Sequence, residues 1–184
     1  FSLLFLCLIL GYEFYYFIVQ GLWQSSLVVV CLFCWYINCL DFIAKLNAIT
    51  GLKFRLPTEA EWEFAARGGN KSRGFLYSGS DNADEVAWHS NLTNGQVKEV
   101  GILKANELGI YDMSGNVFEW CSDWYDWYSS SSQTNPQGPS SGSYRVRRGG
   151  SWYFNAICCR VTYRNCDSPS RAYANYGFRV VCLP

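Results

Sequence analysis

The helical pattern of the chain stops at Gly69, and this break constrains the fold more than any other feature of the sequence. From Gly69 to Asn106, glycine, serine, asparagine and aspartate recur every few residues, which is typical of loops and short strands. A second polar stretch, SSSSQTNPQGPSSGS at residues 129–143, predicts a long loop that needs a rigid scaffold. We therefore expect an α+β fold with an irregular, loop-rich body and short antiparallel strands.

Two helices are predicted before this break. Residues 35–50 carry apolar side chains at helical spacing, and Gly51 behind them is a typical helix stop. In the second helix, Thr58 and Glu61 follow a proline and form the pattern of a capping box. The residues of this helix predicted to face the core are Trp62, Phe64 and Ala65.

The first forty residues are almost uncharged. Phe1 to Leu10 (FSLLFLCLIL) resembles the apolar part of a signal peptide or lipoprotein leader, although Gly11 and the residues after it interrupt the run before the length of a membrane span. We expect residues 1–18 to be a leader remnant or a truncated strand, and residues 12–24 and 27–33 to include strands.

Composition narrows the classes of function. Hydrophobic residues make up 49% and charged residues 16% of the 184 residues, which is enough apolar material for one ordered domain. The net charge is zero and no basic run occurs, so the chain lacks the electrostatic footprint of a nucleic-acid-binding protein. Aromatic residues reach 18%, and such rings either fill an irregular core or face a partner.

Cysteine and histidine leave two further interpretations open. Cys31, Cys34 and Cys39 have a spacing that could hold zinc, but small apolar core residues at a helix start explain them equally. His89 is the single histidine of the chain and could belong to a Ser-His-Asp arrangement. A lone histidine is more often structural.

Four long motifs occur in a fixed order along the chain. They are FRLPTEAEWEFAARGG (54–69), GIYDMSGNVFEWCSDWY (109–125), RVRRGGSW (145–152) and YGFRVV (176–181). Together they resemble the formylglycine-generating-enzyme (sulfatase-modifying factor) domain family, a variant of the C-type lectin fold. The resemblance implies such a domain at residues 19–184, following the segment 1–18.

Enzymes of this family oxidise a substrate cysteine to formylglycine and use two cysteines of their own to hold copper. Thiolates are suitable ligands for cuprous ion. In this sequence the two positions fall on Phe154 and Cys159, so the first ligand is missing. Cys158 could substitute, but neighbouring side chains of an extended segment point to opposite sides. The resemblance therefore implies a domain without copper and without catalysis, and an oxidase using Cys158 and Cys159 is the alternative.

The resemblance also implies a calcium site in the GNVFEW segment. Calcium takes several oxygen ligands at flexible geometry. The matching positions are Asp112 and Glu119 through carboxylates, and Gly115 and Val117 through backbone carbonyls. In the alternative, the two carboxylates cap turns or pair with an arginine, namely Arg145, Arg147 or Arg148.

The segment after Trp152 resembles the variable region of retroelement-diversified proteins, a subset of this family in which adenines of AAC codons are randomised. Such codons never encode Lys, Glu, Gln, Met or Trp. Residues 153–184 contain none of these, whereas residues 1–152 contain 27. Within 153–176, the predicted ligand-binding surface consists of Tyr153, Phe154, Ala156, Ile157, Cys158, Asp167, Ser170, Ala172, Tyr173, Ala174, Asn175 and Tyr176. A polar-aromatic loop without binding function is the plainer interpretation.

The resulting hypothesis is a non-catalytic domain that binds a protein or surface glycan through this segment, because tyrosine, serine and asparagine are typical of adaptable binding surfaces. Display on a cell surface, secretion or a place on a phage particle is expected, with membrane attachment only through a leader or anchor. An oxidase of the family and an inactive fragment are the alternatives.

Overall fold

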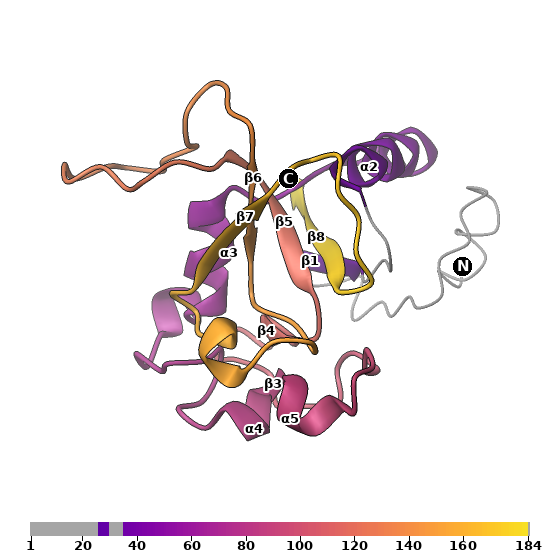
Figure 1. Ribbon diagram of the computed structural model, residues 1–184. Helices are drawn as coiled ribbons and strands as arrows, with labels where there is room; N and C mark the ends of the chain where they lie inside the picture. The colour runs from indigo at the N-terminus through magenta and orange to yellow at the C-terminus, as the bar shows by residue number, and fades with distance from the viewer. Residues whose placement is uncertain (1–25, 30–34, 184) are drawn as a thin grey trace.

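The computed structural model describes residues 26–29 and 35–183. Its central sheet consists of β1 (Ser26–Val29), β2 (Lys53–Arg55), β5 (Phe118–Trp124), β6 (Arg145–Arg148), β7 (Arg164–Asp167) and β8 (Tyr176–Leu183). β8 pairs with β1, β2 and β5, so it lies inside the sheet (Figure 1). β5 and β8 run parallel, unlike the antiparallel pairs expected, and the remaining pairs of this sheet are antiparallel.

The first predicted helix is confirmed as α2 (Tyr36–Thr50). Gly51 ends it in the left-handed conformation, with φ 69°, and donates its N–H to the carbonyl of Asn47. The buried face of α2 packs on the sheet, where the Phe42 ring lies 5.7 Å from the Phe178 ring at a steep angle. An aromatic core therefore joins α2 to β8.

The second predicted helix is confirmed as α3 (Glu59–Ala66), together with its capping box. The Thr58 hydroxyl accepts the N–H of Glu61 at 3.2 Å, and the Glu61 carboxylate accepts the N–H of Thr58 at 2.9 Å. One part of the predicted face is wrong, because Phe64 is 55% exposed. Residues four apart share a helix face, so Ala66 is buried with Trp62 and Phe64 points the other way.

The region after Gly69 contains short helices as well as the loops and strands expected. These are η1 (Gly69–Lys71), α4 (Ala83–Val86) and α5 (Ser90–Thr93), followed later by η2 (Ala156–Cys159). The two short strands β3 (Ala87–Trp88) and β4 (Ser114–Gly115) form a separate parallel pair. Elements of one turn are too short to show a helical period in the sequence. The polar residues 129–143 form the predicted long loop, which projects beside α3 (Figure 1).

Most predictions for the N-terminal part fall outside the described residues, namely those for residues 1–18, the strand within 12–24, and Cys31 and Cys34. β1 lies at the start of the run 27–33 predicted as a strand. Cys39 is fully buried on α2, and its thiol donates to the carbonyl of Trp35 at 3.4 Å. Among the residues that the structure describes, no helix has the length and hydrophobicity of a membrane span.

Candidate ligand-binding site

Two glycines shape the turn that leads from β6 into the predicted binding segment. Gly149 and Gly150 have φ angles of 93° and 75°, which side chains rarely adopt. A Cβ on Gly150 would lie 2.6 Å from the carbonyl oxygen of Cys158 and 2.7 Å from the Cys159 sulfur. Only glycine permits η2 to fold back this closely on the end of β6.

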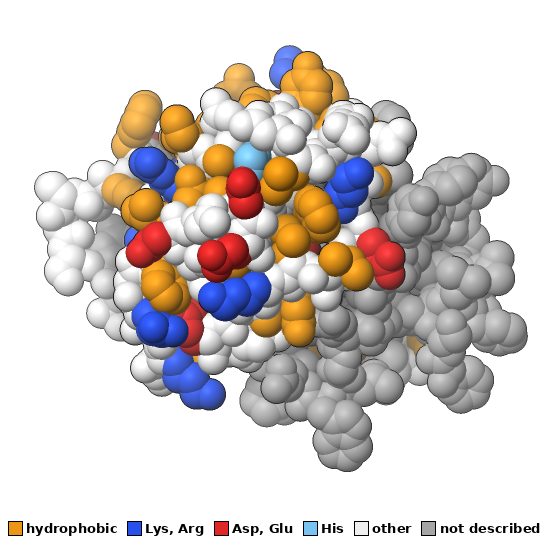
Figure 2. All heavy atoms as spheres, turned by 90° about the horizontal axis from the view of Figure 1, so that it is seen from below, with side chains coloured by type: hydrophobic (Ala, Val, Ile, Leu, Met, Phe, Trp, Pro, Cys, Tyr) orange, Lys and Arg blue, Asp and Glu red, His pale blue; other side chains and the backbone are white. Residues whose placement is uncertain are grey.

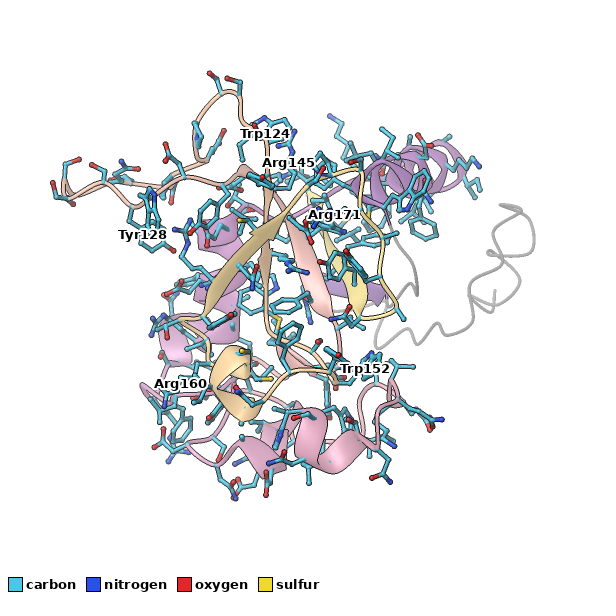
Figure 3. All side chains as sticks on the ribbon, viewed as in Figure 1. Trp124, Tyr128, Arg145, Trp152, Arg160 and Arg171 are labelled. Atoms are coloured by element: carbon cyan, nitrogen blue, oxygen red, sulfur yellow. The ribbon has the colours of Figure 1, made fainter. Side chains whose placement is uncertain are left out.

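The backbone of the first half of the segment is fixed by hydrogen bonds from other parts of the chain. The N–H of Trp152 donates to the carbonyl of Asn116 at 2.8 Å, and the carbonyl of Trp152 accepts the Thr93 hydroxyl at 2.9 Å. The carbonyl of Phe154 accepts the N–H of Ser90 at 2.9 Å. Trp152 therefore lies beside α5 (Figure 3), and main-chain atoms of the segment make these contacts.

The same tryptophan connects the two halves of the segment. Its indole N–H donates to the carbonyl of Ala174 at 3.5 Å, and the Asn175 amide donates to the Ser151 hydroxyl at 3.0 Å. The carbonyl of Asn175 in turn accepts the N–H of Phe118 on β5 at 2.8 Å. Residues 151–154 and 173–175 thus form one frame attached to the sheet.

The structure divides the predicted binding residues into three groups. Exposed are Tyr153, Ile157, Ser170 and Tyr173. Half-buried are Phe154, Ala156, Cys158, Ala172 and Ala174. Buried are Asp167, Asn175 and Tyr176. The buried group belongs to the frame, because its side chains contact the protein interior. On the face that carries α4, α5 and η2, hydrophobic side chains alternate with acidic and basic ones (Figure 2).

Tyr176 shows how the buried group stabilises the frame. Its hydroxyl donates to the carboxylate of Asp167, and burial followed by this bond raises the pKa of Tyr176 above its usual value. The guanidinium of Arg147 lies 4.3 Å from the Tyr176 ring centre and 4.5 Å from that of Phe118. The Tyr176 side chain is therefore buried within this network rather than exposed at the surface.

The copper positions implied by the resemblance do not provide two thiolates. The Phe154 ring packs 5.4 Å from Phe118 and 5.6 Å from Tyr153. Cys159 is fully buried, and burial raises its pKa to about 12, which disfavours the thiolate. Cys158 lies on the 3-10 helix η2 rather than on an extended segment. This donor set does not fit a two-thiolate copper centre.

The two predicted calcium carboxylates differ in availability. Glu119 accepts the Trp62 indole N–H at 2.6 Å. Its two carboxylate oxygens also form a bidentate salt bridge with the Arg179 guanidinium, at 2.5 and 2.6 Å. Among the described residues, Asp112 accepts the N–H of Gly101 at 2.6 Å through one oxygen, and burial raises its pKa to about 6. Asp112 fits a calcium ligand, whereas both oxygens of Glu119 are already engaged by the protein.

The remaining calcium positions lie close to these carboxylates in sequence. Gly115 is on β4, and Val117 is buried just before β5. Within residues 26–29 and 35–183, no group of three or more His, Cys, Asp or Glu side chains could hold a metal, but the predicted set contains only two carboxylates. Calcium therefore remains a prediction. The alternative partners Arg145, Arg147 and Arg148 bond to Ser122, Asn165 and Glu63 instead.

His89 has a structural environment. Its ring is buried, and Nε2 lies 2.9 Å from the Asp84 carboxylate. It is followed directly by α5, whose Ser90 N–H holds the backbone of Phe154. The His89 side chain therefore contacts α4, and the backbone of the next residue connects α5 to the segment.

The structure also contains a hollow that the sequence did not predict. It has a volume of about 760 Å³ and lies between α3 and the loop that follows β5. The aromatic run DWYDWY (123–128) before the polar loop was the available signal. Sequence alone did not place this run beside α3.

A mixed sheet, two main helices and an irregular half that frames residues 151–175 define the class of C-type-lectin-like, sulfatase-modifying-factor domains. The chain belongs to this family, because residues 23–183 match the model of the sulfatase-modifying factor enzyme 1-like domain. Both the family and the fold class predicted from the sequence are thereby confirmed.

Three relatives show how varied the family is. The chain is 41% identical over 145 residues to the chaperone protein LppX of Paenibacillus barcinonensis, covering 70% of this chain and 49% of that protein. It is 36% identical over 143 residues to the formylglycine-generating enzyme of Streptomyces coelicolor, covering 68% and 45%. The structure of Treponema denticola variable protein 1 superposes with a TM-score of 0.79 at 28% identity, covering 94% and 77%. The chain spans about half the length of the first two proteins.

Proposed function

We propose that this domain is non-catalytic and binds a ligand through exposed side chains of residues 153–176. The observation that carries the proposal is the Phe154 ring, which packs against Phe118 at the position where the family's first copper thiol is expected. Without that sulfur, Cys159 has no partner in the expected arrangement. The family scaffold then serves as a frame for recognition.

The way the segment is anchored supports this proposal. The carbonyl oxygens of Trp152, Phe154 and Ala174 accept hydrogen bonds from outside the segment or across it. Backbone carbonyls are present whatever the side chain, so side chains at the surface can change while the frame stays. This property suits a segment whose composition matches adenine mutagenesis, and the likeness to a variable protein agrees with it.

The exposed side chains indicate the kind of ligand. Tyr153 is 67% exposed, and Ile157 and Tyr173 are also exposed. Tyrosine gives a large contact area at a low entropic cost, and the mixture of apolar and polar groups suits a protein or surface glycan. We infer display on a cell surface, secretion or a phage particle as the setting in which such a ligand is met.

A turnover experiment tests the non-catalytic part of the proposal. The copper-treated protein is incubated with a sulfatase-motif peptide, and formylglycine is measured by mass spectrometry beside the Streptomyces coelicolor enzyme as a positive control. We expect no formylglycine from the native chain. Formylglycine that disappears in a Cys158→Ser variant would instead support the oxidase that uses Cys158 and Cys159.

A matched variant tests the missing copper-ligating thiol at position 154. Phe154→Cys supplies a thiol at the first position, and cuprous-ion binding is titrated for both proteins. We expect tighter binding by Phe154→Cys than by the native chain. Equally tight binding by the native chain would contradict the interpretation that Phe154 abolishes the metal site. A cooperative thermal transition of the native chain would show that it is a folded domain, which distinguishes either result from that of an unfolded, inactive fragment.

A further inference from the structure

The groove of about 760 Å³ between α3 and the loop after β5 is distinct from the segment 153–176. One wall is α3, with Glu59, Glu63 and Phe64, and the other is formed by residues 124–139. In Figure 3, Tyr128 lies between the loop and α3, and its hydroxyl approaches the Glu59 carboxylate at 3.4 Å. A hollow of this size accommodates a small ligand or part of a chain.

The outer wall is anchored to the sheet rather than free. A Cβ on Gly138, whose φ is 70°, would lie 2.9 Å from the carbonyl oxygen of Trp124 and 3.2 Å from the Cβ of Asp123. The N–H of Tyr125 donates to the carbonyl of Tyr144 at 2.8 Å, which closes the base of the loop. The loop therefore returns closely over the end of β5, and this contact fixes the groove's shape.

The base of the groove is a preformed ion pair stacked on a ring. Arg164 makes two bonds of 2.6 Å to the Glu59 carboxylate. The same guanidinium lies 3.7 Å from the centre of the Tyr128 ring. Arg164 and Glu59 therefore satisfy each other, and the stacking holds Tyr128 in place.

The other charged groups of the groove also have partners within the protein. Arg67 bonds to the Glu63 carboxylate at 2.7 and 2.8 Å. Asp123 accepts the N–H of Glu59 at 2.9 Å, and Asp126 accepts the N–H of Trp127 at 2.8 Å. The paired arginines offer little to an anion, whereas the Asp123 and Asp126 carboxylates can accept hydrogen bonds from ligand hydroxyl groups, so these groups favour a hydroxyl-rich ligand without negative charge.

Exposed aromatic rings narrow the ligand class further. Trp127 is 83% exposed, and Phe64 on the facing helix is exposed as well. Flat rings give apolar contact area, while the hydroxyl and amide groups of Ser129, Ser131 and Gln137 supply donors and acceptors. A ligand with apolar C–H faces and many uncharged hydroxyl groups can pack on the rings and hydrogen-bond to these polar side chains. We propose that this groove binds a neutral oligosaccharide.

Binding is tested by calorimetric titration of the native chain with maltohexaose, cellohexaose, mannohexaose and hexa-N-acetylchitohexaose. The comparison probes are a heparin hexasaccharide, which is anionic, and a decaproline peptide, which represents recognition of proline-rich chains by aromatic grooves. We expect saturable binding of at least one neutral hexasaccharide and weaker or no binding of the comparison probes. No neutral binding up to about 10 mM, or binding of heparin or decaproline alone, overturns the proposal.

Two variants place the binding on the groove. Trp127→Ala removes an exposed ring, so folding is unaffected, and the affinity for the neutral ligand should fall about tenfold or more. Ile102→Ala is the matched control, because Ile102 is an exposed apolar residue outside the groove. The affinity of this variant for the neutral ligand should equal that of the native chain. An unchanged affinity of Trp127→Ala, or an equal loss in Ile102→Ala, contradicts the proposed location.

Discussion

Strand β5 and the frame 151–175 lie side by side, joined where the N–H of Phe118 donates to the carbonyl of Asn175. The two regions differ in the hydrogen bonds that stabilise them. On β5, side chains bond to side chains, as where Glu119 joins Trp62 to Arg179. In the frame, buried side chains such as Asn175 also bond to one another, but the contacts to the Trp152 and Phe154 carbonyls use the backbone. Substitution should therefore be costly in the first region and cheap at exposed positions of the second.

The largest effect is expected from Glu119→Gln. This change leaves the buried Arg179 guanidinium without its opposite charge, and the free energy of unfolding should fall by about 3–5 kcal/mol. Chemical denaturation measures it. Glu61→Gln is the control, because the side chains of its pair with Arg55 are 37% and 43% exposed, and it should cost less than about 1 kcal/mol. Equal losses in both variants would contradict the contrast between buried and exposed bonding.

The pH dependence of Asp112 gives the next effect. Its pKa is about 6 in the folded protein, raised from 3.8 chiefly by burial. The folded state thus holds the proton more tightly than the unfolded state, and stability should fall as pH rises from about 4 to 6, by about 3 kcal/mol. Denaturation of the native chain and of Asp112→Asn, both in EDTA, isolates this loss. Parallel pH curves would show that Asp112 has an ordinary pKa.

Tyr176 and Tyr173 sharpen the comparison within one segment. Tyr176→Phe removes the hydroxyl that donates to buried Asp167, and the expected loss is about 1–3 kcal/mol. Tyr173→Phe removes a hydroxyl from an exposed ring, and unfolding should change by less than about 0.5 kcal/mol. If the two variants lose the same stability, Tyr176 does not belong to the frame.

Calcium should have a smaller effect. Because Asp112 is the one predicted carboxylate with a free oxygen, we expect weak, millimolar binding, which at ten times Kd adds about 1.4 kcal/mol. Thermal melts with calcium or magnesium measure the shift, and Asp112→Asn should abolish it. A melting temperature independent of calcium would contradict the predicted calcium site.

The smallest effects are expected at the exposed binding positions. Tyr153→Ser and Ile157→Ala should each change the free energy of unfolding by less than about 0.5 kcal/mol, since their backbone environment is unchanged. Denaturant titration of a small library randomised at both positions provides the measurement. Losses above about 1 kcal/mol in most members would show that these side chains stabilise the fold.

Local signals in the sequence were sufficient for the helices and for the family. The capping box and Gly51 act within a few residues, so the ends of α2 and α3 could be predicted. The prediction for Phe64 was wrong, because residues two apart in a helix point in different directions and Trp62 is the buried one of the two. The four ordered motifs specified the fold class correctly even though the parallel pairing of β5 and β8 was not foreseen.

Non-local contacts account for what the sequence left open. The partner of Glu119 is Arg179, 60 positions away, rather than the nearer arginines of β6. Burial of Asp167 and Tyr176 likewise depends on Arg147 from another strand. The groove is lined by α3 and by the loop that carries Trp127. No periodicity in either of these two segments indicates that they lie next to each other.

β8 lies inside the sheet, although it is the last of the described elements in the chain and is therefore synthesised last. During synthesis, β1, β2 and β5 must wait for residues 176–183 to leave the ribosome before they gain their shared neighbour. A stop codon anywhere in 153–175 would remove that neighbour. A chain truncated within residues 153–175 therefore lacks the strand that β1, β2 and β5 share, and it cannot complete the central sheet.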